Sequence, residues 1–199
     1  GAVAHDLRTP LSRLKLRLEN ISDDKLQSQM RQDLNDMIAM LDATLTYLHE
    51  QRTSEAQQLM DVQALVESLC ENAQDQGADV HVSGHCAPLP VQPMALRSCL
   101  NNLMDNALRY AGQARIELHD QREQLLIRVI DHGPGIAEDK REAVFEPFFR
   151  LEGSRNRNSG GVGLGMTIAR EAAQRLGGQL NLEETPGGGL TAIIRLPRA

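Results

Sequence analysis

The sequence contains no tryptophan, and aromatic residues make up only 3% of its 199 positions. A core without large rings has to be built from Leu, Ile, Val, Met and Ala, which favours helix-rich packing. Cysteine is scarce as well: Cys70, Cys86 and Cys99 are odd in number, and none belongs to a CxxC pair. This pattern predicts neither a disulfide framework nor a zinc site, and it fits a reducing compartment.

Long hydrophobic runs and an excess of positive charge are also missing. No stretch of about 18 apolar residues occurs and the N-terminus lacks the order of a signal peptide, so we expect no membrane span and no export signal. The 21 Lys and Arg residues against 27 Asp and Glu residues give a net charge of -6. We therefore expect no nucleic-acid partner, because the chain cannot neutralise a phosphate backbone over a broad surface.

Two heptad seams stand out in residues 1–52. The first joins Leu7, Leu11, Leu14, Leu18 and Ile21, and the second joins Met30, Leu34, Met37, Leu41, Thr44 and Leu48. Steps of four and three place each set on one helix face, and the polar residues 22–24 separate the two helices. The pattern predicts an antiparallel hairpin. Because an isolated hairpin leaves half of each stripe in water, we expect a homodimer that forms a four-helix bundle.

The rest of the chain alternates helical and strand patterns. Residues 53–60 lose the heptad pattern and are predicted as a linker, and residues 61–199 as a second domain. Helices are expected from Asp61 to about residue 76, at 93–110 and at 164–176, and strands at 79–83, 115–120, 125–131, 179–184 and 190–196. The whole is an α+β chain whose second domain is an α/β sandwich, with helices on one face of a mixed sheet.

The first candidate site is the HDLRTP stretch of residues 5–10. His5 and Thr9 share a helix face while Leu7 faces the core, so the His5 side chain is predicted to point into solvent. An exposed imidazole is largely unprotonated near neutral pH and is a usable nucleophile, and the Asp6 carboxylate is placed to fix its tautomer and take its proton. Taken alone, such a pair is more often an ordinary surface contact.

The second candidate is a polar stripe on the predicted helix 93–110. Asn102 and Asn106 lie four residues apart, and Arg109 follows three residues later. They share one face, and an amide oxygen is a neutral hard ligand that suits Mg²⁺. Without further support, the stripe is more simply a polar outer face.

Two glycine-containing loops complete the candidates. Asp131 begins the stretch DHGPGI, in which glycines around a proline make a tight turn that lets a flat ligand lie against the backbone. Residues 160–165, GGVGLG, follow a basic stretch and open a helix, where backbone amides bind phosphate. The second loop is neither a Walker A loop nor a dinucleotide fingerprint. A plain strand-to-helix turn would look like the first, and the glycines of residues 187–189 fit a hairpin turn.

The order and spacing of these motifs resemble the sensor histidine kinases over essentially the whole chain. The matching boxes are the H-box at residues 5–10, the N-box at 100–110, the G1 box at 131–135, the F-box at 145–150, the G2 box at 161–165 and a glycine turn at 187–189. The resemblance implies the nucleotide fold that gyrase and the large heat-shock chaperone share, with residues 145–161 as a mobile lid over ATP.

The resemblance also implies roles for single residues, with ATP and Mg²⁺ as cofactors. His5 would be the phosphoacceptor, Asp6 would assist it, and Thr9 would position water when the same protein dephosphorylates its partner. Asn106 would ligate Mg²⁺, and Arg150 would contact the γ-phosphate. The other implied nucleotide-site residues are Asn102 and Arg109 at the phosphates, Tyr110 and Asp131 at the adenine, and Gly133, Gly135, Ile136, Phe148, Gly161, Gly163, Leu164 and Gly165.

The implied partner is a response regulator whose aspartate receives the phosphoryl group from His5. Intact relatives carry membrane helices and a sensing region before the H-box, and this chain begins at Gly1 without Met. We therefore expect a piece of a bacterial inner-membrane protein that lies in the cytoplasm and meets the membrane only through an upstream segment.

Two other function classes fit parts of the sequence. A gyrase-type ATPase clamp explains the nucleotide motifs but not the hairpin that bears His5. A catalytically silent dimerisation module explains the hairpin but predicts no ATP binding, whereas Asn106, Asp131 and the G2 glycines predict binding that needs Mg²⁺.

Overall fold

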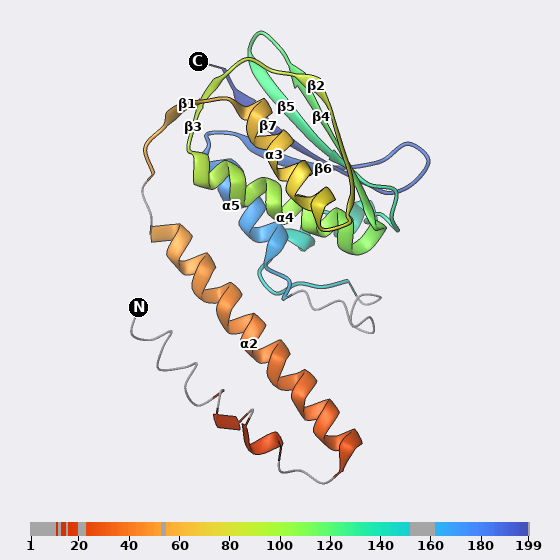
Figure 1. Ribbon diagram of the computed structural model, residues 1–199. Coiled ribbons are helices and arrows are strands. Elements are labelled where there is room, and N and C mark those ends of the chain that lie inside the picture. Colours follow the sequence, from red (N-terminus) through yellow and green to blue (C-terminus); the bar gives the residue numbers. More distant parts are fainter. Residues whose placement is uncertain are drawn as a thin grey trace. The chain divides into compact units, whose positions relative to one another are not determined.

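The computed structural model of the chain describes residues 11, 13–14, 16–19, 23–52, 55–151 and 162–198. The chain divides into an N-terminal unit that ends at Thr53 and a C-terminal unit that begins at Ser54 (Figure 1). The predicted catalytic residues His5, Asp6 and Thr9 lie outside the described residues, and so does Gly161.

The N-terminal unit is dominated by α2 (Asp24–Arg52), a helix of 29 residues. Asp23 caps it, because its Oδ1 accepts hydrogen bonds of 3.0 Å from the backbone N–H groups of Lys25 and Leu26. Before this cap, residues 11, 13–14 and 16–18 are also helical. None of the described helices, α2 included, combines the length and the apolar composition that a membrane span needs.

Much of the predicted heptad seam is exposed within one chain. Leu18 and Leu34 are buried. At least 40% of the residue surface is exposed at Leu14, Met30, Met37 and Leu48. The dimer that would cover these side chains stays a prediction.

The C-terminal unit is built on a mixed sheet of five strands, in the order β2-β4-β5-β7-β6. The strands are β2 (Asp79–His85), β4 (Gln113–Asp120), β5 (Gln124–Ile130), β6 (Gln179–Glu184) and β7 (Leu190–Pro197). Only β2 and β4 pair in parallel, and the other neighbours are antiparallel. The helices α3 (Val62–Asp75), α4 (Pro93–Ala111) and α5 (Gly165–Arg175) cover one face of the sheet (Figure 1). The predicted α/β sandwich is confirmed.

The core lies between this helix layer and the sheet. Alternate residues of each strand point toward the helices, so Leu125, Ile127 and Val129 of β5 are buried while the residues between them are only half-buried. The helices meet them with apolar stripes, of which Val66 in α3 and Leu100 in α4 are fully buried.

The helix bounds follow local signals. The Asp61 side chain accepts a 2.9 Å hydrogen bond from the Ala64 N–H and so caps α3, as predicted. Helix α4 ends at Gly112, which adopts a left-handed conformation with φ of 73°. Two short 3-10 helices, Glu138–Lys140 and Ala143–Phe145, lie between β5 and α5.

A second, two-stranded sheet was not predicted. Strand β1 (Gln58–Met60), which lies within the predicted linker 53–60, pairs antiparallel with β3 (Leu89–Val91). Strands of three residues are too short to show a period of two, and the partner of β1 lies about 30 positions further along the chain. The end of the predicted linker is therefore strand.

Candidate functional site

The asparagine stripe lies along α4, beside the buried face of that helix. Leu100 and Leu103 are buried against the sheet, and Asn102 and Asn106 are half-buried at the edge of this contact. The Asn102 Nδ2 donates a 2.8 Å hydrogen bond to the Ser98 carbonyl, one turn earlier. This bond orients the side chain and leaves its amide oxygen free to accept a donor.

The carboxylate of Asp131 is buried just after β5, with 5% of the residue surface exposed. Its Oδ1 accepts hydrogen bonds from the Gly133 N–H at 2.9 Å and from the Leu190 N–H at 3.1 Å. The Asp131 N–H donates to the Leu190 carbonyl at 2.9 Å. Both of these hydrogen bonds from described residues end on Oδ1, so Oδ2 can accept a donor from a ligand.

The glycine turn of residues 187–189 packs backbone to backbone against this loop. A Cβ atom on Gly189 would lie 2.1 Å from the Asp131 carbonyl oxygen, and Gly189 has a φ of 117°. A Cβ atom on Gly135 would lie 3.0 Å from the Gly189 carbonyl oxygen. The two loops can approach this closely only because neither glycine has a side chain.

This packing predicts the effect of Gly189→Ala. We expect its free energy of unfolding to fall by about 2 kcal/mol more than that of Gly188→Ala, because only the first adds a clash to the strained φ. Gly188 is the matched control: its φ is 102°, and a Cβ atom there meets nothing within 4 Å. Urea unfolding measures the difference, and equal midpoints for the two variants would contradict the packing argument.

The start of α5 brings two further motifs together. A Cβ atom on Gly163 would lie 2.9 Å from the carbonyl carbon of Phe148, and the Phe148 N–H donates to the Gly163 carbonyl at 2.9 Å. Phe148 has a φ of 66° and is half exposed. Two residues further on, a Cβ atom on Gly165 would lie 3.2 Å from the Asn102 Oδ1. The F-box, the G2 box and the N-box therefore meet at this point.

The remaining predicted nucleotide-site residues of the described chain lie around these loops. Tyr110 is half-buried and Arg109 exposed near the end of α4. Ile136 packs against the core after the Asp131 loop, and Leu164 is 2% exposed before α5. Arg150 is half-buried just before residues 152–161, which lie outside the described chain.

No pattern in the sequence predicted the anchoring of the F-box on α5. The Thr167 Oγ1 donates a 2.9 Å hydrogen bond to the Phe145 carbonyl, and the Arg170 guanidinium lies 4.4 Å from the centre of the Phe145 ring. These partners are more than 20 residues apart, so no local spacing signals them.

Cys99 of α4 contacts α5, and its thiol is not a candidate nucleophile. Its Sγ donates to the Ala169 carbonyl at 3.3 Å, and burial raises the pKa of the thiol to about 12. A thiol with this pKa stays protonated near neutral pH, and the thiolate is the reactive form. Within the described residues, no three or more His, Cys, Asp or Glu side chains gather in a way that could hold a metal ion.

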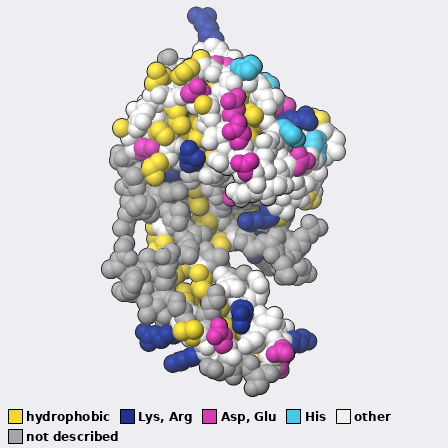
Figure 2. Space-filling view, viewed as in Figure 1, with side chains coloured by type: hydrophobic (Ala, Val, Ile, Leu, Met, Phe, Trp, Pro, Cys, Tyr) yellow, Lys and Arg dark blue, Asp and Glu magenta, His cyan; other side chains and the backbone are white. Residues whose placement is uncertain are grey.

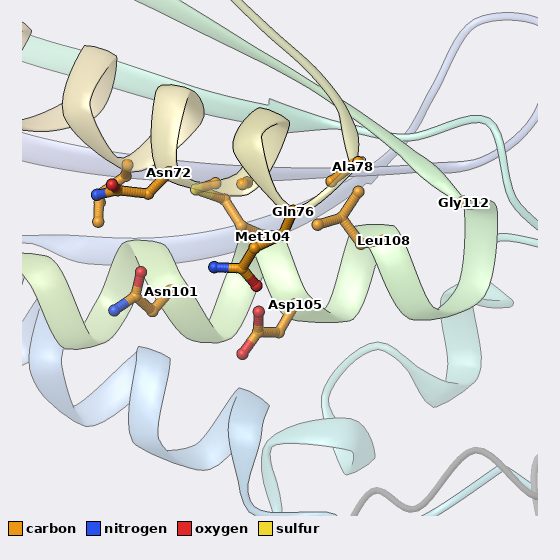
Figure 3. A pocket seen from close by; sticks show the side chains of 11 residues that line it. Asn72, Gln76, Ala78, Asn101, Met104, Asp105, Leu108 and Gly112 are labelled. Atoms are coloured by element: carbon orange, nitrogen blue, oxygen red, sulfur yellow. The ribbon is translucent and has the colours of Figure 1, made fainter.

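A pocket of about 430 Å³ lies away from this site, between α3 and α4 (Figure 3). It is lined by Leu69, Asn72, Ala73, Gln76, Gly77, Ala78, Asn101, Met104, Asp105, Leu108 and Gly112. No predicted nucleotide residue is among them, and the one charged lining side chain is the carboxylate of Asp105. Figure 2 shows Asp and Glu side chains gathered over α3, which has no Lys or Arg. Such a surface repels a triphosphate.

A mixed sheet with helices on one face and glycine loops converging on an asparagine-bearing helix is the arrangement of an ATP-binding domain. Residues 91–199 match the family described as Histidine kinase-, DNA gyrase B-, and HSP90-like ATPase. This match covers more than half of the chain, and the chain belongs to that family.

Comparison with individual relatives indicates which group within this family the chain resembles. Sensor histidine kinase GtrS of Pseudomonas aeruginosa is 38% identical over 199 residues, which cover 100% of this chain and 41% of that protein. The chain therefore spans less than half the length of this relative. The predicted resemblance to the sensor histidine kinases, with an ATP-binding catalytic domain, is confirmed.

Two solved structures share the fold. A crystal structure of full-length ShkA in complex with AMPPNP has a TM-score of 0.73 at 20% identity, and the likeness covers 100% of this chain and 45% of that one. Histidine kinase ThkA in complex with the response regulator protein TrrA has a TM-score of 0.70 at 19% identity, over 100% and 60% of the two chains. At these identities the likeness concerns the fold alone.

Proposed function

We propose that this chain is a protein histidine kinase that moves the γ-phosphoryl group of ATP to His5 and then to an aspartate of a response regulator. One observation carries the proposal: an ATP-binding domain of this family occurs in the same chain as an HDLRTP motif that opens a heptad pattern in the sequence. An ATPase clamp needs no exposed histidine on a helical stem. The relative GtrS is itself named a sensor histidine kinase, which supports the proposed kinase activity.

Asp131 and the α4 stripe are proposed to hold the nucleotide. The free Oδ2 of the buried Asp131 carboxylate accepts the exocyclic amine of adenine, and Tyr110 packs near the ring. Asn102 and Arg109 support the phosphates. The N-terminus of α5 at Gly165 offers backbone N–H groups and the positive end of a helix dipole to phosphate oxygens. Arg150 contacts the γ-phosphate from the start of the lid.

Asn106 is proposed as the protein ligand of Mg²⁺. Its neutral amide oxygen suits a hard cation that keeps most of its ligands as water and phosphate oxygens. Because the described residues contain no acidic or histidine cluster for a metal, the ion is expected to enter together with the nucleotide. Bound Mg²⁺ would neutralise charge on the phosphates during transfer.

His5 is proposed to act as the nucleophile. A ring nitrogen forms a bond to the γ-phosphorus, the bond from that phosphorus to the bridging oxygen breaks, and ADP leaves with the electron pair. The Asp6 carboxylate takes the imidazole proton. In a separate, opposing reaction, Thr9 positions a water that attacks the aspartyl phosphate of the response regulator, which releases inorganic phosphate and regenerates the aspartate. The protein is then bifunctional.

We further propose a homodimer through the heptad seam. Leu14, Met30, Met37 and Leu48 are each at least 40% exposed within one chain. Pairing two hairpins buries such stripes in a four-helix bundle. As the resemblance implies, the parent protein would be a bacterial inner-membrane sensor with this part in the cytoplasm, and we expect no nucleic-acid partner.

The proposed reaction is tested by mixing the chain with γ-labelled ATP and Mg²⁺. We expect the protein to become labelled through a bond that acid breaks and base preserves, as a phosphorus–nitrogen bond to histidine behaves. Release of free phosphate without protein label would instead support the ATPase clamp. Absence of both labelling and AMPPNP binding would favour the silent dimerisation module.

A further inference from the structure

The pocket between α3 and α4 contains none of the residues proposed to hold the nucleotide (Figure 3). Its volume of about 430 Å³ lies in the range of small-molecule sites. The floor of the pocket is apolar, because Leu69 and Met104 are buried and Leu108 is half-buried. A methionine side chain in such a floor can adapt its shape to an aliphatic ligand.

Polar side chains from both helices surround this floor. Asn72 and Gln76 come from α3 and its C-terminal cap, and Asn101 and Asp105 come from α4 (Figure 3). All four residues are exposed. They offer one carboxylate and three amide carbonyls as acceptors, and no Lys, Arg or His is among the residues that line the pocket. A ligand that carries positively charged N–H donors is therefore complementary to this rim.

The ends of two helices add to the negative potential of the pocket. Gln76 is the C-cap residue of α3 and Gly112 is that of α4, and both line the pocket. The C-terminal end of a helix carries a partial negative charge. The last turn of α3 contains no basic residue, and Arg109 in the last turn of α4 is not among the lining residues. This preference for a cation is independent of the Asp105 carboxylate.

The surface of α3 extends the negative potential beyond the pocket. This helix contains Glu67, Glu71 and Asp75 but no Lys or Arg, and Figure 2 shows Asp and Glu side chains gathered over it. A surface of one sign raises the local concentration of small ions of the opposite sign.

We propose that the pocket binds a small aliphatic amine that carries more than one ammonium group. The ammonium groups donate to the Asp105 carboxylate and to the amide carbonyls of the rim, and the methylene chain lies on Met104 and Leu108. An inorganic cation lacks the apolar chain, and a neutral alcohol lacks the charge, so the combination of rim and floor selects an organic cation. This site goes beyond the proposed kinase function and does not depend on it.

The first test titrates the unaltered chain with spermidine in the absence of nucleotide. Calorimetry gives the Kd, and NMR spectra of the ¹⁵N-labelled chain locate the site. We expect saturable binding that shifts the backbone amide resonances of Gly77 and Gly112, which line the pocket. Hexaamminecobalt(III) has the same charge as spermidine but no methylene chain, so we expect it to bind at least about threefold more weakly.

The second test uses three variants. Asp105→Asn keeps the shape of the side chain and removes its charge, so we expect spermidine to bind about fivefold more weakly. Asp75→Asn is the matched control, because Asp75 is an exposed carboxylate of α3 that does not line the pocket. We expect its Kd to change by less than about twofold. Asn106→Ala should bind spermidine as the unaltered chain does, because Asn106 belongs to the nucleotide stripe and not to the pocket.

Equal losses in Asp105→Asn and Asp75→Asn would overturn the proposal, because they would show attraction to the acidic surface in general. Equal binding of hexaamminecobalt(III), or resonance shifts that leave out Gly77 and Gly112, would overturn it as well. N-acetyl-lysine methylamide presents the same ammonium on a protein side chain. If it binds as tightly as spermidine, the pocket serves a basic side chain of a protein partner and not a free amine. None of these results bears on the labelling of His5, which tests the kinase function separately.

Discussion

Replacing His5 by Gln is expected to abolish labelling of the protein by γ-labelled ATP, a loss of at least about a thousandfold, because no other group forms the phosphorus–nitrogen bond. Nucleotide affinity should stay within about twofold of the unaltered chain, since the proposed ATP contacts belong to residues 102–165. Labelling is measured as the amount of acid-labile, base-stable phosphate on the protein. Nucleotide affinity is measured by titration with AMPPNP. The expected result is thus a split between binding and chemistry.

His81→Gln is the control for this prediction. His81 is an exposed histidine on β2 whose Nε2 lies 3.0 Å from the Asp79 Oδ1, so it reproduces a histidine beside an aspartate without the helical setting. We expect this variant to label at the unaltered rate. If His5→Gln still acquires base-stable label, or if His81→Gln loses it, His5 is not the phosphoacceptor.

Asn106→Ala is expected to lose both nucleotide binding and labelling. Removing the proposed protein ligand of Mg²⁺ should weaken Mg²⁺-dependent AMPPNP binding by about 100-fold, which corresponds to about 2.7 kcal/mol. The fold should survive, because the Asn106 side chain is only half-buried and the neighbouring Leu103 and Ala107 keep α4 in the core. Calorimetric titration with and without EDTA measures the effect.

Asn101→Ala provides the matched control on the same helix. Asn101 is exposed and lines the pocket between α3 and α4 (Figure 3). The substitution therefore removes an amide from the adjacent face of the helix. Its AMPPNP affinity and its response to EDTA should equal those of the unaltered chain. An Asn106→Ala protein that binds AMPPNP with unchanged affinity and unchanged Mg²⁺ dependence would exclude Asn106 as a metal ligand.

The helices of the C-terminal unit were predicted to within one or two residues because their limits are written in local chemistry. Asp61 before an apolar periodic run marks the start of α3, and Gly112 marks the end of α4 through its left-handed conformation. A cap or stop of this kind acts on residues at most one turn away. The same locality explains why the sequence identified the stripe of Asn102 and Asn106.

Contacts between distant segments could not be predicted in this way. The β1–β3 pair has too few residues to show a period, and the bond from Thr167 to Phe145 joins elements 22 positions apart. Glu55 lies in a stretch whose composition indicates a linker, yet its carboxylate completes a helix 39 positions further on. Each of these depends on which segments the folded chain brings together.

The sequence by itself determined the local elements and the chemical types of the candidate site: the helix and strand periods, the caps, the glycine turns and the exposed polar stripe. These depend on neighbours a few residues apart, which the order of amino acids states directly. Only the tertiary structure decided that the buried Asp131 is held by Leu190, that Gly165 lies against Asn102, and that Glu55 caps α4. Such contacts follow from the packing of the whole C-terminal unit, because a hydrogen bond or a close backbone approach between distant segments forms only once the core has placed them.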